Sequence, residues 1–235
     1  MHTSTMRIMA AATFVFCLWS LSGCGTAPVP RAGDGTLVVL RTGPRREPLD
    51  AAASREVFQG HFANMRRLAD AGHLLLAGPY GAEKSDPALR GVFLLATADL
   101  AQAKSWAETD PGFLAGVFAF DYHRFTTMAP LRHVLDRELA AENAAKAAGK
   151  ERKPGDGGRS YVLVTANAAA APVLAGRDDV LLRLELADGR TLAWLDATQV
   201  ATVRERLQPE APAGALQFDA WFGSGFLTEL PRAGG

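Results

Sequence analysis

The chain has 235 residues, its 25 Lys and Arg residues balance 25 Asp and Glu residues, and 48% of its residues are hydrophobic. This hydrophobic content is ample for a packed core, and the length fits one or two domains. Because basic and acidic residues balance, the chain has no excess of positive charge of the kind found in nucleic-acid-binding proteins, and no nucleic-acid partner is expected. The two cysteines, Cys17 and Cys24, are too few for a disulfide framework.

The N-terminus has the pattern of an export signal. Arg7 precedes an apolar run of about a dozen residues, which suits a secretory signal and is too short for a membrane-spanning helix. The run ends in the motif LSGC, which resembles the lipobox of bacterial lipoproteins and implies cleavage before Cys24 and membrane anchoring through lipid on that cysteine. Gly25 in place of Asp favours the outer membrane of the cell envelope, facing the periplasm. We predict a signal peptide at residues 1–23 and a tether at 24–35; cleavage elsewhere or an uncleaved anchor are the alternatives.

Residues 36–128 predict a β-α-β-β-α-β unit. Asp50 or Ser54 can cap the first helix and Asp99 the second, which is expected from residue 100 to about Thr109. Gly72 is expected to end the first helix, whose apolar face combines Val57, Phe58, Phe62, Met65, Leu68 and Ala69. The order of elements is that of a ferredoxin-like α+β unit, whose helices cover one face of the sheet and whose other face needs a cover.

His61 and Asp110 are the candidate catalytic residues. His61 lies on the apolar stripe of the first helix, and Asp110 precedes Pro111, which is expected to end the second helix together with Gly112. Because both helices share one face of the sheet, the two side chains could meet, and a carboxylate that fixes the tautomer of an imidazole makes a general acid or base. The alternatives are a core histidine bonded to a backbone carbonyl, an aspartate that only shapes a helix end, and a two-ligand metal site.

Several short motifs follow one another in an order that resembles the YCII-related family. The motifs are His61 before a helix, Ala71-Gly72, Leu74 to Pro79, Ala98-Asp99-Leu100 with Ala103, Asp110-Pro111 and Gly116-Val117-Phe118. The resemblance covers under half of the chain and implies a ferredoxin-like unit that pairs as a dimeric α+β barrel. It also implies that His61 and Asp110 face a small cavity. The best-understood relatives are similar to muconolactone isomerases and act as dehydrochlorinases on small ring-cleavage acids.

The other histidines give weaker expectations. His73 is expected to be exposed or in a turn, His123 to face solvent rather than a cavity, and His133 to have no role. No spacing of His, Asp and Glu resembles a dedicated metal site, and the sequence has no P-loop, GxGxxG or GxSxG motif. No metal or cofactor is therefore expected.

The remainder of the chain predicts a helical connector and linker at 129–159 and a second α+β unit at 160–230. The second unit again reads β-α-β-β-α-β with a much shortened first helix, and Gly214–Asp219 parallels Gly116–Asp121. We interpret it as a degenerate copy that closes an intramolecular α+β barrel, a pseudo-dimer; a coincidental order of elements is the alternative. Because the second unit has no histidine, a single site is expected.

These patterns predict a lipid-anchored YCII-like protein that uses His61 and Asp110 for proton transfer on a small organic acid. The expected reaction is a cofactor-independent elimination or isomerisation, which makes the protein a lyase or an isomerase. The main alternative is a non-catalytic binding or assembly module of the cell envelope, and a ligand carrier or sensor is a third. The sequence does not predict whether the protein associates with itself.

Overall fold

The computed structural model describes residues 33–231. The predicted signal peptide, Cys24 and most of the predicted tether lie outside this range. The first half of the described chain consists of β1 (Gly33–Thr42), α1 (Ala51–Asp70), β2 (Leu74–Pro79), β3 (Leu89–Leu95), α2 (Leu100–Ala107), α3 (Pro111–Leu114) and β4 (Phe118–Thr127). Strand β1 therefore starts inside the segment that was predicted to be a tether.

The second half follows a long helix. Its elements are α4 (Leu131–Ala147), β5 (Gly158–Ala166), the 3₁₀ helix η1 (Ala171–Leu174), β6 (Val180–Leu186), β7 (Thr191–Leu195), α5 (Val200–Leu207), the 3₁₀ helix η2 (Gln208–Glu210), β8 (Leu216–Ser224) and the 3₁₀ helix η3 (Gly225–Glu229). The short η1 stands where the shortened helix was predicted. No helix in the described range is long and apolar enough to cross a membrane.

The eight strands form one hydrogen-bonded sheet in the order β2-β3-β1-β4-β6-β7-β5-β8, and every neighbouring pair is antiparallel. The first four strands have the ferredoxin-like order, and the last four repeat it. The predicted α+β class is thus confirmed. The tandem-copy barrel stays a prediction.

The two halves of the sheet meet at both of their ends. Strands β4 and β6 pair at Phe125–Leu186 and Thr126–Glu185. At the other end, beyond β2, Tyr80 forms a bridge with Trp221 of β8, and the backbone N–H of Gly81 donates to the carbonyl of Ala220 over 2.7 Å.

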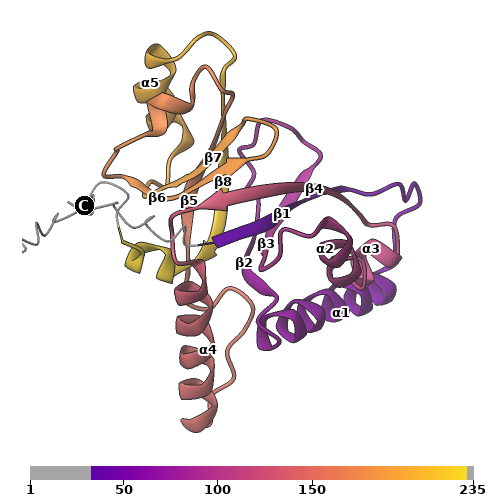
Figure 1. The fold of residues 1–235 in the computed structure, drawn as a ribbon. Coiled ribbons are helices and arrows are strands. Elements are labelled where there is room, and N and C mark those ends of the chain that lie inside the picture. Colours follow the sequence, from indigo (N-terminus) through magenta and orange to yellow (C-terminus); the bar gives the residue numbers. More distant parts are fainter. Residues whose placement is uncertain (1–32, 232–235) are drawn as a thin grey trace, which may run out of the picture. The chain divides into compact units, whose positions relative to one another are not determined.

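Pleating distributes the strand side chains between helix-covered faces and a central core. Figure 1 shows α1, α2 and α3 gathered beside β1–β4, and α5 lying beside the later strands. In β1, Leu37 joins the central cluster while the adjacent Val38 packs under the first-half helices. In β5, Tyr161 and Val162 divide in the same way between the central cluster and the cluster that contains α5.

The buried face of α1 differs from the prediction. Phe58 and Phe62 were expected in the core but are 39% and 43% exposed. The buried residues of the helix are His61, Asn64 and Leu68, which are spaced by three and four positions and form the stripe that faces the sheet. Phe62 follows His61 directly and Phe58 precedes it by three positions, and both rings remain partly exposed beside the buried stripe.

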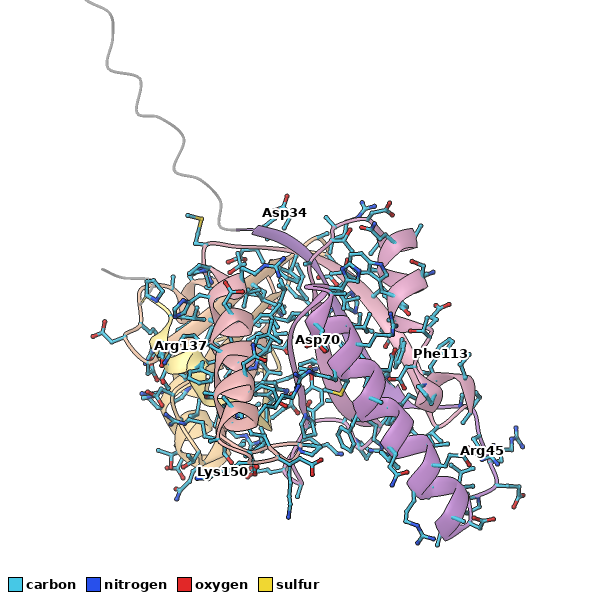
Figure 2. All side chains as sticks on the ribbon, turned by 90° about the horizontal axis from the view of Figure 1, so that it is seen from below. Asp34, Arg45, Asp70, Phe113, Arg137 and Lys150 are labelled. Atoms are coloured by element: carbon cyan, nitrogen blue, oxygen red, sulfur yellow. The ribbon has the colours of Figure 1, made fainter. Side chains whose placement is uncertain are left out.

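Helix α4 packs on the rest of the fold through apolar side chains and also forms an ion pair with α1. Leu131 and Val134 belong to the central core. Arg66 of α1 forms an ion pair with Glu142 of α4, with 2.9 Å between Nη1 and Oε1. Figure 2 shows the two helices next to each other, with Arg137 on α4 and Asp70 at the end of α1.

Candidate functional site

His61 is held at the site by a well-formed helix. Asp50 caps α1, and its carboxylate accepts from the backbone N–H groups of Ala52 and Ala53 over 2.9 and 2.8 Å. His61 lies three turns into the helix on the face toward the sheet and is only 7% exposed. A buried imidazole needs partners for its nitrogens, so its surroundings decide what it can do.

Asp110 caps a short helix that the sequence interpretation missed. Pro111 was expected to end the second helix, but it is the first residue of α3, where its missing N–H costs nothing. Asp110 Oδ1 accepts from the N–H groups of Gly112 at 2.8 Å and Phe113 at 3.4 Å. In the sequence, Asp110 followed by Pro111 was the signal that could have predicted the start of this helix. Figure 2 shows Phe113 of α3 beside α1.

A glycine allows α1 and α3 to approach closely. A Cβ atom added to Gly60 would lie 2.8 Å from Cγ of Pro111. This close approach occurs one residue before His61 and one residue after Asp110. The close packing of the two helices therefore sets the distance between the two functional side chains.

His61 and Asp110 form a direct hydrogen bond. Nδ1 of His61 lies 2.7 Å from Oδ2 of Asp110, and Asp110 is fully buried. An ionised carboxylate only accepts, so this arrangement assigns the imidazole proton to Nδ1. Among the described residues, Nε2 of His61 has no hydrogen-bond partner, which leaves its lone pair available to a ligand.

Four phenylalanine rings surround the imidazole. The ring of Phe93 stacks on that of His61 at 5.9 Å between centroids, and Phe118 lies 5.2 Å away. The partly exposed rings of Phe62 and Phe58 lie at 5.4 and 6.4 Å. This apolar wall strengthens the hydrogen bond to Asp110 by lowering the local dielectric. The described part of the chain has two cavities, of about 360 and 640 Å³, and neither His61 nor Asp110 lines either of them. The small cavity that the family resemblance implies beside His61 and Asp110 therefore stays a prediction.

A polar network beside the pair was not predicted. Oδ1 of Asn64 accepts from Nη2 of Arg67 at 2.8 Å and from the hydroxyl of Thr109 at 3.2 Å. The amide nitrogen of Asn64 is buried without a hydrogen-bond partner in the described part of the chain. In the sequence, the signal that could have predicted this network was Asn64 itself, a polar residue one turn after His61 on the buried face of the helix.

The other histidines lie apart from this pair. His73 stacks on Trp106 with 3.8 Å between ring centroids, and His133 Nε2 lies 3.5 Å from Glu229. The prediction that His123 faces solvent is wrong, because its side chain lines the 360 Å³ cavity. Burial and the neighbouring Arg190 lower the pKa of His123. Across residues 33–231, no three His, Cys, Asp or Glu side chains are grouped to hold a metal ion.

The fold and the site define an α+β domain with a buried imidazole–carboxylate pair. Residues 37–125 match the family model of the YCII-related domain. The chain therefore contains a YCII-related domain, and both His61 and Asp110 lie within it.

A comparison with curated proteins finds no match. Among solved structures, the chain is similar to 5-chloro-2-hydroxyhydroquinone dehydrochlorinase from Burkholderia phenoliruptrix AC1100 in complex with 2,5-dihydroxybenzoquinone. The identity is 23%, the similarity covers 37% of this chain and 89% of that chain, and the TM-score is 0.27.

Proposed function

We propose that this protein transfers a proton on a small organic acid, with His61 as the general base and Asp110 as its positioning partner. The observation that carries the proposal is the 2.7 Å hydrogen bond between His61 Nδ1 and Asp110 Oδ2, which leaves Nε2 without a protein partner. Asp110 holds the tautomer in which Nε2 can accept a proton, and its negative charge stabilises the imidazolium that then forms.

The chemistry needs no external cofactor. Nε2 removes a proton from a carbon next to a carbonyl, and the electrons of that C–H bond form a new double bond. In an elimination, a leaving group departs from the adjacent carbon with its electron pair. In an isomerisation, the imidazolium returns the proton to a different carbon of the same molecule. Both outcomes fit the lyase and isomerase chemistry that the family resemblance implies.

Deuterium exchange tests this proposal without knowledge of the natural substrate. Muconolactone, a small lactone acid with protons next to a carbonyl, is incubated in D₂O with the protein, and the loss of those protons is followed by ¹H NMR. We expect His61→Ala to slow the protein-dependent exchange by at least about a hundredfold, because a positioned general base contributes that much. His73→Ala, which removes a histidine stacked on Trp106, should exchange at the wild-type rate. Equal rates in His61→Ala and the wild type would rule out His61 as the base.

A membrane anchor is the second part of the proposal. The lipobox-like motif before Cys24 supports lipidation of that cysteine, and several acyl chains anchor a protein stably. The anchor would place the domain in the cell envelope, where we propose the outer membrane. Fractionation of Cys24→Ala tests it: the variant should leave the membrane fraction, and retention there contradicts lipid anchoring.

The packing around His61 favours the non-catalytic alternative, a cell-envelope binding or assembly module. Phe93 and Phe118 lie against the imidazole ring, and neither of the two cavities reaches it. In that case the His61–Asp110 pair would stabilise the junction of α1 and α3 without turnover. The exchange experiment separates the two functions, because a purely structural pair predicts no protein-dependent exchange at all.

A further inference from the structure

A second polar site lies between the two halves of the sheet. It is the cavity of about 360 Å³, and its lining comes from both halves of the chain. The first half contributes Val39, Arg41, Asp121 and His123, and the second half contributes Thr165, Gln217 and Asp219. Six of its fifteen lining residues lie beyond the YCII-related domain, so the site belongs to the whole chain.

Equivalent positions of the two halves line the cavity. In the first half, Val39 of β1 pairs with Asp121 of β4. In the second half, Leu163 of β5 pairs with Asp219 of β8. Asp121 and Asp219 thus occupy the same place in the two strand patterns, and both line the cavity.

Asp219 is a buried acid that faces this space. It is 2% exposed, and its Oδ1 accepts from the backbone N–H of Ser85 over 2.5 Å. Burial raises the pKa of its carboxyl and the nearby Asp86 adds to this, whereas hydrogen bonding with Ser85 and the charge of Lys84 lower it in part. A carboxyl group can accept a hydrogen bond from a hydroxyl group of a ligand.

Tyr80 brings a hydroxyl to the same space. Its backbone forms the bridge to Trp221 that joins the two ends of the sheet, so its position is fixed by both halves. Within the described part of the chain, the Tyr80 hydroxyl has no hydrogen-bond partner, although the residue lines the cavity. Burial and the nearby Asp219 raise the pKa of Tyr80, so the hydroxyl keeps its proton.

The two arginines that line the cavity are already paired. Arg41 forms ion pairs with Asp86 and Asp121. Arg190 forms an ion pair with Asp188, with 2.6 Å between Nη2 and Oδ2. With both arginines paired, the Tyr80 hydroxyl and the Asp219 carboxyl remain to form hydrogen bonds with a ligand. Such contacts suit an uncharged ligand.

We propose that this cavity binds a small uncharged ring compound that carries hydroxyl groups. Tyr80 and Asp219 provide its polar contacts, and Leu37, Leu186 and Leu192 provide the apolar surface for its ring. The volume is that of a small-molecule site, and the lining combines this apolar surface with a larger number of polar side chains. The site is separate from the His61–Asp110 pair.

Resorcinol is the probe, because it is an uncharged ring with two hydroxyl groups. It is titrated by calorimetry into the full chain in detergent, with a detergent blank. We expect saturable binding that Tyr80→Phe weakens by about three- to tenfold, the value of one buried hydrogen bond. Asp219→Asn, which keeps an acceptor for the Ser85 N–H, should also weaken binding, and His61→Ala should leave it unchanged. 1,3-Dimethoxybenzene, which cannot donate a hydrogen bond, should bind at least about threefold more weakly than resorcinol.

Three results would overturn the proposal. The first is no saturable binding of resorcinol at millimolar concentration. The second is wild-type affinity in both Tyr80→Phe and Asp219→Asn, with circular dichroism showing that both variants are folded. The third is loss of binding in His61→Ala, which would move the ligand to the other site. Because Tyr80→Phe leaves His61 and Asp110 intact, its muconolactone exchange rate should stay at the wild-type value, and the two proposals can fail independently.

Discussion

Replacing Asp110 with alanine should lower the free energy of unfolding by about 3 kcal/mol. The change removes the cap of α3 and leaves the N–H of Gly112 without its 2.8 Å acceptor. It also leaves Nδ1 of His61 unpaired in a site where the imidazole is largely buried. Each buried polar group that loses its partner costs a large part of its desolvation energy. Urea unfolding followed by circular dichroism measures the loss.

Asp99 provides a matched control for this substitution. It caps α2 with the same distances, 2.8 Å to the N–H of Ala101 and 3.4 Å to that of Gln102, but it is exposed and has no histidine partner. Asp99→Ala should therefore cost only about 1 kcal/mol. A double-mutant cycle with His61→Ala should show a coupling of at least about 1 kcal/mol between His61 and Asp110. Equal losses in the free energy of unfolding for Asp110→Ala and Asp99→Ala would mean that the hydrogen bond to His61 adds no stability beyond that of helix capping.

Trp221→Ala should lower the free energy of unfolding by about 4 kcal/mol. Trp221 is 1% exposed, and its ring packs edge-on against Trp194 with 5.7 Å between centroids. Its Nε1 donates to the carbonyl of Gly78 in β2 over 3.0 Å. The substitution therefore leaves a large cavity and an unpaired carbonyl where β8 meets the other end of the sheet.

The control for Trp221 is a tryptophan that is only partly buried. Trp106 of α2 stacks on His73 rather than in the central core, and Trp106→Ala should cost about 1 to 2 kcal/mol. Hydrogen exchange adds local detail: in Trp221→Ala, the amides of Gly81 and Ala220, which hold the joint between the halves, should exchange faster. Similar losses for both tryptophans would contradict a central role for Trp221.

Much of the fold could be predicted because the strands and helix ends have strong local signals. Asp50 and Asp99 cap α1 and α2 as predicted, and Gly72 follows α1 with a φ of +72°, which glycine adopts readily. The buried side of α1 was predicted only in part. His61 and Leu68 are buried as the apolar stripe predicted, but the polar Asn64 is also buried, and Phe58 and Phe62 are not.

The candidate site was only partly visible in the sequence. The meeting of His61 and Asp110 followed from placing their helices on one face of the sheet. The start of α3 at Asp110 was missed because a proline was taken as a helix end. The cavity lined by Tyr80 and Asp219 depends on contacts between residues 134 or more positions apart, such as that of Ser85 with Asp219. No local pattern in the sequence carries information of that kind.

The tautomer of His61 tests the central claim most directly. Long-range ¹⁵N–¹H correlation spectra of the ¹⁵N-labelled chain report which imidazole nitrogen carries a proton, and His61→Gln identifies the signals by their absence. The geometry at Asp110 predicts a proton on Nδ1 and a bare Nε2 in the neutral ring. A neutral ring with its proton on Nε2 would contradict the account, because the nitrogen proposed as the base could then not accept a proton.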